Sequence, residues 1–274
     1  MADYIKVDFL KSDAGVRKEL IYRLSNCVAT KIATKVETPE AYRQAVKEGF
    51  SLFQGFYFCM PELLANAKVP ANRHIHFQIL QHLYHDPLDL QRVSQLVMRD
   101  AALTYRLLRL VNSPACAIRQ EITSVEAAIM VVGESTFRRM AALAILSELN
   151  AGHPPEILHI ALVRARFCEL AAPHCALDAA EQYLLGMLSL LPAMLNLPME
   201  TLAAQVPLRH EIRQALLGSH NPERRLLTWL ELHERGAWDE GDAIVRSLGL
   251  SHQQLIQFYA DSVVWDDAAR GSVA

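Results

Sequence analysis

The first 60 residues alternate between strand-like and helix-like patterns of apolar side chains. In residues 4–10 every second side chain is apolar from Ile5 to Phe9, which predicts a strand with one buried face. Thr38 and Pro39 are typical of a helix N-cap and of the first helical position. The expected elements are strands at 4–10, 27–36 and 50–53 and helices at 14–26 and 39–48. This order predicts parallel pairing with right-handed crossovers.

Beyond residue 72 the strand pattern gives way to amphipathic helices. Their apolar side chains recur at helical spacing, and Asp, Ser or Pro often stands where a helix begins. Helices are predicted at 74–85, 90–98, 101–111, 125–132, 134–149, 156–171, 179–189, 199–204, 208–217, 222–233, 238–247 and 251–263. Short loops between such helices indicate a compact bundle. The predicted fold class is therefore mainly α: an all-α helical bundle preceded by a small, incomplete α/β segment.

The stretch 65–72 is small, polar and contains Pro70, and it is the predicted linker. It separates an α/β segment at 1–64 from an all-helical domain at 73–274. Three parallel strands cannot close a barrel, so one edge and one face of the sheet need another cover. We therefore expect a homo-oligomer.

Charge and composition narrow the classes of partner. The 27 basic and 30 acidic residues give a net charge of −3, so the broad basic field that nucleic acids or anionic membranes attract is missing. No run approaches the roughly 20 apolar residues that span a bilayer, and the N-terminus lacks the order of a signal peptide. Five cysteines without a Cys-x-x-Cys pair indicate reduced thiols in a cytoplasmic protein. We expect neither nucleic acid nor membrane as a partner.

Three motifs in the first segment resemble a known enzyme family. They are Ile5-Lys6-Val7-Asp8, Ala33-Thr34-Lys35-Val36-Glu37-Thr38 and Gln54-Gly55-Phe56. In this order and spacing they are similar to the C-terminal third of the EAL domain, a (β/α) barrel that hydrolyses cyclic di-GMP. The resemblance implies that Lys6 and Gln54 stand at an active-site lysine and glutamine. It also implies that Thr34 stands at the family's catalytic glutamate.

The departures from the EAL pattern remove its chemistry. Thr34 cannot act as a carboxylate base or hold a divalent cation as a carboxylate does. The EAL tripeptide and the paired aspartates of the metal site have no counterpart in this chain, and two-metal hydrolysis needs several convergent carboxylates. We therefore expect a degenerate EAL segment with no catalytic residue, no metal and no cofactor. Lys6 and Gln54 remain as relic ligand-binding positions.

The helical segment carries a second, longer set of motifs. These are Val97-Met98-Arg99-Asp100-Ala101-Ala102-Leu103-Thr104, Leu107-Leu108-Arg109-Leu110-Val111-Asn112-Ser113 and Ile122-Thr123-Ser124-Val125-Glu126-Ala127-Ala128-Ile129, with Val132-Gly133 after them. The pattern resembles the HDOD domain, a relative of HD-type metal phosphohydrolases, with Ala101 in place of the usual proline. Ser189 and Leu190 stand where HD enzymes carry His-Asp, and His159 stands near their first histidine. The resemblance implies a signalling domain without hydrolase activity.

Two surface features remain as candidates. Arg106 and Arg109 share a helical face, and Asn112 and Ser113 end that helix, either as a helix stop or as part of a partner surface. These four residues are the predicted interaction surface. The histidines at 74, 76, 82 and 85 are expected on a half-exposed polar face rather than at a metal.

The sequence therefore predicts a regulatory protein that is not an enzyme. It would act through protein–protein interaction of its HDOD domain with unidentified signalling proteins, in a pathway related to cyclic di-GMP. One alternative is a nucleotide-sensing module that binds cyclic di-GMP through Lys6, Gln54 and the arginines without turnover. Another is a metal-dependent phosphohydrolase with an unrecognised set of histidines.

Overall fold

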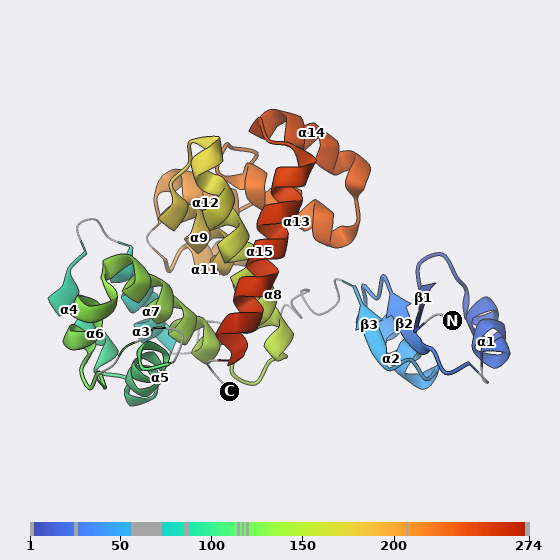
Figure 1. Cartoon of the computed structure of the whole chain (residues 1–274), viewed down its shortest axis with the longest axis horizontal. Coiled ribbons are helices and arrows are strands. Elements are labelled where there is room, and N and C mark those ends of the chain that lie inside the picture. Colours follow the sequence, from blue (N-terminus) through green and yellow to red (C-terminus); the bar gives the residue numbers. More distant parts are fainter. Residues whose placement is uncertain are drawn as a thin grey trace. The chain divides into compact units, whose positions relative to one another are not determined.

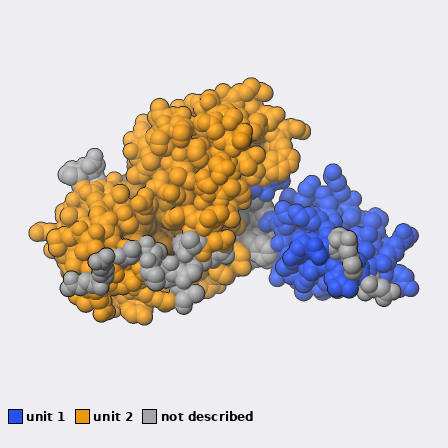
Figure 2. Space-filling view, viewed as in Figure 1, with its two compact units in different colours: residues 1–60, 234–236 blue, residues 61–233, 237–274 orange. Residues whose placement is uncertain are grey.

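The computed structural model describes residues 3–24, 27–55, 73–84, 88–113, 116, 118, 121–206 and 208–271. The chain forms two compact units, one of residues 1–60 and 234–236 and one of residues 61–233 and 237–274 (Figure 1, Figure 2). The predicted linker at 65–72 lies outside the described residues, and so does His85. The boundary at 65–72 stays a prediction. The mainly α fold class, with one small sheet, is confirmed.

The first unit is built on three parallel strands in the order β1-β2-β3, as predicted. Its elements are β1 (Tyr4–Asp8), α1 (Ala14–Arg23), β2 (Thr30–Thr34), α2 (Pro39–Lys47) and β3 (Leu52–Gln54). Asp13 and Thr38 cap the two helices by accepting the N–H groups of Val16 and Ala41. These caps satisfy donors that the first helical turn leaves unpaired, which is why the helices begin there.

The two faces of this sheet differ in character. Val7 and Ala33 are buried in a core that also holds Ala45 of α2, with Leu20 of α1 packed against it. Side chains alternate across a strand, so the polar residues between them share the other face. Gly55 follows β3 and is required there, because a Cβ atom would lie 2.1 Å from the carbonyl oxygen of Val36. Both helices therefore cover the apolar face, and no described element of this unit covers the polar face.

The second unit is entirely helical in its described residues. Its elements are α3 (His74–Leu83), α4 (Leu90–Val97), α5 (Ala101–Val111), α6 (Val125–Val132), α7 (Glu134–Leu149), α8 (Pro155–Ala171), the 3-10 turn η4 (Ala172–Cys175), α9 (Ala179–Leu188), α10 (Leu191–Leu195), α11 (Met199–Ala203), α12 (His210–Leu216), α13 (Arg224–Arg235), α14 (Trp238–Leu248) and α15 (His252–Gly271). None of the helices in the described part of the chain has the length and apolarity to cross a membrane.

The predicted helices agree with these bounds, with two differences. The five-residue α10 was not predicted, because so short a helix gives no periodic pattern. Helix α15 runs to Gly271 instead of ending at 263. Its last turns make tertiary contacts with α8, since Asp266 pairs with His159 and Trp265 lies under Arg166. Packing therefore extends this helix beyond its apolar pattern.

Helices α8 and α9 pack closely against each other. Gly186 of α9 lies so near the backbone of α8 that a Cβ atom would come within 2.5 Å of the Arg164 carbonyl oxygen and 2.7 Å of the Ala165 nitrogen. Helix α15 packs on α8 as well (Figure 1). These helices hold the side chains described below.

Candidate functional site

Lys6 and Gln54 lie on the same polar face of the sheet, and both side chains are exposed. The register aligns Gln54 with Thr34 and Asp8 at the carboxyl ends of the three strands, whereas Lys6 pairs with Ile32 one repeat earlier. Asp8 forms an ion pair with Lys35 (3.1 Å). The Thr34 hydroxyl donates to the Val7 carbonyl (3.2 Å). The structure thus brings Lys6 and Gln54 to one face of the sheet. The Asp8 carboxylate on the same face is paired with Lys35.

The predicted interaction surface divides into inward and outward side chains. Asn112 donates to the carbonyls of Leu108 (2.9 Å) and Ile122 (2.8 Å) and accepts from the Ile122 N–H (2.8 Å). Ser113 is buried. Arg106 bonds Glu148 and the Ser147 hydroxyl, and Arg109 is exposed. Asn112 and Ser113 therefore close the helix end, and a partner surface here depends on the arginines.

The positions that correspond to metal ligands in HD enzymes hold other partners. The Ser189 hydroxyl accepts a hydrogen bond from Arg164 (3.0 Å), and that guanidinium is buried, with Glu231 3.9 Å away. His159 Nδ1 lies 3.3 Å from Asp266 Oδ1 across α8 and α15. In the described part of the chain no three His, Cys, Asp or Glu side chains gather to hold a metal ion. The residues at this place do not fit a metal, because a buried cation stands beside Ser189.

His76 differs from the half-exposed position expected of it. It is buried and its Nε2 lies 3.0 Å from the carboxylate of Asp100, the N-cap of α5. Burial alone would raise the pKa of Asp100, but hydrogen bonds from the Leu103 N–H and from His76 hold that pKa below its ordinary value. This pair joins α3 to the start of α5.

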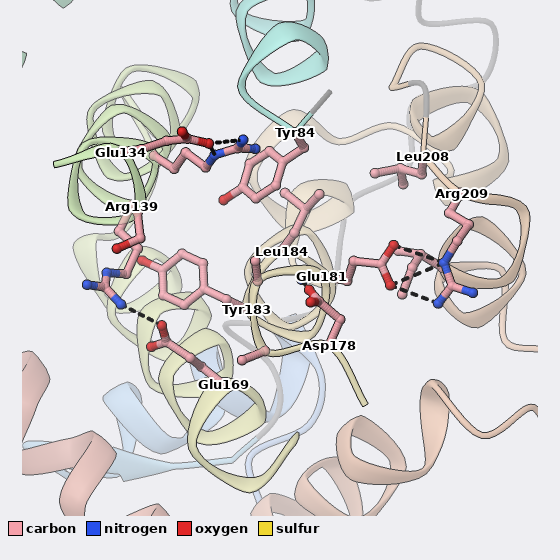
Figure 3. A pocket seen from close by; sticks show the side chains of 15 residues that line it. Tyr84, Glu134, Arg139, Glu169, Asp178, Glu181, Tyr183, Leu184, Leu208 and Arg209 are labelled. Atoms are coloured by element: carbon pink, nitrogen blue, oxygen red, sulfur yellow. Dashed lines mark hydrogen bonds and ion pairs between the residues drawn. The ribbon is translucent and has the colours of Figure 1, made fainter. Parts of the chain in front are cut away.

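A cavity of about 680 Å³, here called the first chamber, opens among α7, α8, α9 and α12. Figure 3 shows side chains from these helices around it. Its charged lining residues are Glu134, Arg138, Arg139, Glu169, Asp178, Glu181 and Arg209. Four acidic groups against three basic ones leave this chamber slightly negative.

Tyr183 is buried and Tyr84 is half-buried, and both line the first chamber with buried hydroxyl groups that find no hydrogen-bond partner among the described residues. Burial raises the pKa of both phenols well above the ordinary value, and nearby Glu169 adds to the effect. Both groups therefore stay protonated and can donate a hydrogen bond. Neither tyrosine was predicted, and no sequence pattern distinguishes them from core aromatic residues.

A second chamber of about 660 Å³ shares Arg139 and Tyr183 with the first. Arg139 and Arg166 bind the two oxygens of one carboxylate, Glu169, at 2.7 and 2.6 Å. The Arg166 Cζ atom lies 5.7 Å from the centre of the Trp265 ring. Arg139 and Arg166 are the charged side chains of this lining, so its charge is positive.

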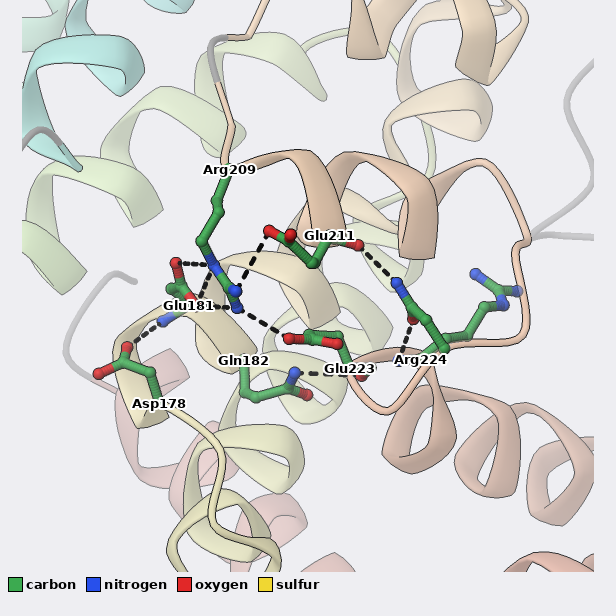
Figure 4. A network of polar contacts seen from close by, with 8 residues as sticks. Asp178, Glu181, Gln182, Arg209, Glu211, Glu223 and Arg224 are labelled. Carbon is green, nitrogen blue, oxygen red and sulfur yellow. Dashed lines mark hydrogen bonds and ion pairs between the residues drawn. The ribbon is translucent and has the colours of Figure 1, made fainter.

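A polar network centred on Arg209 stabilises the far side of the first chamber (Figure 4). Arg209 binds Glu181 at 2.8 Å, Glu223 at 2.8 Å and Glu211 at 3.2 Å. Arg209 donates hydrogen bonds to Glu181 and Glu223, and these bonds raise the pKa of the guanidinium, so it stays protonated. Gln182 adds a bond to the Glu223 carbonyl (3.0 Å). The network joins α9 to the starts of α12 and α13.

The helical unit corresponds to a known family. The HDOD domain model matches residues 69–254, which include every helix from α3 to α14. The chain belongs to the HDOD domain family. The HDOD part of the sequence prediction is confirmed, whereas the EAL resemblance of residues 1–64 lies outside the matched range and stays a prediction.

Two relatives of this HDOD protein align with it over more residues than the HDOD domain contains. The "Uncharacterized protein YuxH" of Bacillus subtilis is 30% identical over 267 residues, which are 96% of this chain and 65% of that protein. The "Cyclic di-GMP phosphodiesterase CdgJ" of Vibrio cholerae is 32% identical over 236 residues, 85% of this chain and 55% of that protein. The chain thus spans about two thirds or less of each. A crystal structure of a "Putative phosphohydrolase" from Shewanella amazonensis is also similar, with 14% sequence identity and a TM-score of 0.49. The matched part makes up 73% of this chain and 93% of that protein.

The name of CdgJ corrects one prediction. The sequence analysis predicts a protein that is not an enzyme, but a relative that aligns with 85% of the HDOD chain is named a phosphodiesterase. The prediction is wrong because it counted only the carboxylates within these 274 residues. The aligned residues make up 55% of CdgJ.

Proposed function

We propose that the chain works in cyclic di-GMP signalling as part of a phosphodiesterase system, with its HDOD domain binding a partner protein that alters turnover of the nucleotide. The support for the nucleotide is CdgJ, named a cyclic di-GMP phosphodiesterase, which aligns with 85% of the chain. The support for a protein partner is the outward face of α5. A cytoplasmic location is part of the same proposal.

The outward face of α5, here called the α5 face, consists of Ala102, Tyr105, Arg106 and Arg109. Tyr105 is 68% exposed although its ring is large and apolar. Arg109 lies one turn further along the same side of the helix. Tyrosine and arginine are the residues that most often dominate binding energy at protein interfaces. This face is the single observation that carries the interaction role.

Capture from the source cell tests the α5 face. The tagged full chain is cross-linked, and bound proteins are identified by mass spectrometry for the wild type, Tyr105→Glu and Arg109→Glu. Tyr22→Glu, at a tyrosine of α1 that is 80% exposed, is the matched control. We expect a partner that is recovered with the wild type and the control and lost with both α5 variants. An identical set of proteins from all four chains would contradict the interaction role.

A turnover assay tests the link to cyclic di-GMP. Conversion of cyclic di-GMP to its linear dinucleotide is measured with Mg²⁺ or Mn²⁺, for the full chain alone and for the chain with the captured partner. We expect the partner to change the rate with the wild-type chain and not with Tyr105→Glu. A rate that is the same with and without the partner would remove the phosphodiesterase part of the proposal.

A second candidate function is nucleotide binding at the polar sheet face. Lys6 and Gln54 share this face, and ligands of parallel α/β folds bind at the carboxyl ends of the strands. This geometry supports the proposal that the first unit is the C-terminal part of a degenerate EAL barrel. The homo-oligomer is supported by the sheet edges at β1 and β3, which have no further strand beside them in the described residues and could pair with a second copy.

Calorimetry with cyclic di-GMP tests the second candidate. We expect heat of binding with the wild type and with Lys18→Ala, an exposed lysine of α1 that serves as control. Lys6→Ala and Gln54→Ala should each weaken binding about tenfold, the loss that one charged hydrogen bond gives. Equal affinities in all four chains would rule out this face.

A further inference from the structure

The wall between the two chambers carries more arginine side chains than carboxylates. Arg139 of α7 and Arg166 of α8 share the single carboxylate of Glu169, which leaves one net positive charge. The first chamber adds more acids than bases to this wall. The second chamber adds no acidic group from the residues that the structure describes, whose charged members in this lining are Arg139 and Arg166. An anion therefore has a favourable place only on the side of the second chamber.

The same wall carries buried hydrogen-bond donors that lack acceptors. Within the described part of the chain the Tyr183 hydroxyl has no hydrogen-bond partner, although the residue is only 2% exposed, and it lines both chambers. Figure 3 shows the Tyr183 ring extending from α9 toward Arg139. The Nε of Arg166 is also buried without a partner. Orphaned buried donors are costly, and an acceptor-rich group bound here would satisfy both.

The rest of the second chamber is mainly apolar, and Ser113, Cys116 and Thr136 are the polar side chains in this part of its lining. Its wall is formed by side chains of α5, α6, α7 and α15, which include Leu110, Val131, Met140, Leu143 and Trp265. A volume of about 660 Å³ is in the range of pockets that hold small organic ligands. One end is therefore cationic and rich in donors, and the body of the chamber suits a flat, apolar group.

We propose that the second chamber binds an organic phosphate of nucleotide size. Its phosphate accepts hydrogen bonds from Arg139, Arg166 and Tyr183, and its ring lies along the apolar wall beside Trp265. Arginine pairs and phenol hydroxyls are suited to phosphate oxygens. Because the site lies where α7 meets α8, α9 and α15, an occupied chamber fixes these helices against one another. The proposal is independent of the α5 face and of the sheet face.

Tryptophan fluorescence and calorimetry on the full chain test the proposal. The probes are GMP, guanosine and inorganic phosphate. GMP should bind and change the fluorescence, and the response should disappear in Trp265→Phe. Guanosine lacks the phosphate and inorganic phosphate lacks the ring, so each should bind at least about tenfold more weakly.

Variants of the shared wall separate this site from others. Arg166→Gln should weaken GMP binding by tenfold or more, as expected for a charged hydrogen bond. Tyr183→Phe should weaken it by about threefold to tenfold, and it keeps the ring in place, so folding is preserved. Arg246→Gln changes an exposed arginine of α14 outside the chamber and should leave binding unchanged.

Three outcomes would overturn the proposal. The first is no binding of GMP at about 1 mM, where even weak ligands register. The second is GMP binding that Arg166→Gln and Tyr183→Phe leave unchanged. The third is equal affinity for GMP and inorganic phosphate, which would show an anion site without a place for the ring. None of these outcomes affects partner capture by the α5 face, so the two proposals fail separately.

Discussion

The side chain of Asn112 pairs with the main chain of Ile122 in both directions. Asn112 Oδ1 accepts the Ile122 N–H at 2.8 Å, and its Nδ2 donates to the Ile122 carbonyl at 2.8 Å. A third bond, to the Leu108 carbonyl, closes the last turn of α5. The Asn112 amide thus binds the main chain of the segment that leads into α6 and holds this segment against the end of α5.

Replacing Asn112 with alanine should destabilise the helical unit by about 2 kcal/mol, because three hydrogen bonds are lost and the Ile122 main chain is left unpaired. Urea unfolding followed by circular dichroism measures this loss. Asn112→Asp keeps the acceptor for the Ile122 N–H and should cost less than alanine. Gln95→Ala, at an exposed position of α4, is the control and should change stability by less than about 0.5 kcal/mol. Equal stability of Asn112→Ala and the control would show that the pairing does not hold the segment.

Two helical glycines should respond to alanine in opposite directions. Gly186→Ala places a Cβ atom 2.5 Å from the Arg164 carbonyl oxygen, so α8 and α9 must separate. We expect a loss of about 1–3 kcal/mol. At Gly241 of α14 the nearest atom is 3.8 Å away, so Gly241→Ala should stabilise by about 0.5–1 kcal/mol through helix propensity. Thermal unfolding of both variants checks the contrast, and a shift of the same sign in both would contradict the close packing of α8 on α9.

The pair of His76 and Asp100 predicts a pH dependence of stability. The pKa of Asp100 is below its ordinary value of 3.8 in the folded protein. Its carboxylate therefore stabilises the fold fully above that value, and the contribution is lost as pH falls through the lower folded pKa. The stability difference between wild type and Asp100→Asn should shrink as pH falls below about 4. Urea unfolding across this range measures it, and a difference that grows toward low pH would contradict the assignment.

The network of Arg209 predicts a dependence on salt. Arg209→Gln leaves the carboxylates of Glu181, Glu211 and Glu223 facing one another without their cation. We expect a loss of about 1 kcal/mol at low ionic strength, the upper range for partly exposed pairs. Added salt screens the repulsion, so the loss should shrink at about 0.5 M NaCl. Denaturation at both salt concentrations checks this. A loss that is independent of salt would assign the effect to packing of the arginine side chain.

Most helices were predictable because their signals are local. The helices predicted from residues 90, 101 and 125 begin there in the structure, because Asp89, Asp100 and Ser124 each cap the helix by accepting an N–H group three residues ahead. The parallel sheet followed from the order of its elements. The end of α15 was not predictable, because it depends on Trp265 and Asp266 packing against α8, about 100 residues away in the sequence.

The chambers could not have been predicted from the sequence. Arg139, Arg166 and Tyr183 belong to three different helices, and each is unremarkable in its local pattern. The sequence directed attention to the Asn112-Ser113 motif, whose conspicuous residues serve the fold. The polar sheet face could be predicted in part, since alternation along a strand places Lys6 and Gln54 on one side. Only tertiary structure shows that Asp8 on that face is already paired with Lys35.

The contact at Gly186 has a mechanical consequence. Two helices whose backbones touch cannot slide or rotate past one another without a clash, so α8 and α9 should move as one stiff body. Helix α7 meets that body through side chains such as Arg139, whose bond to Glu169 can break and re-form. We therefore expect α8 and α9 to keep their relative position when other helices of this unit move. Arg139 also lines the second chamber, so a ligand bound there would contact the side chain that joins α7 to α8.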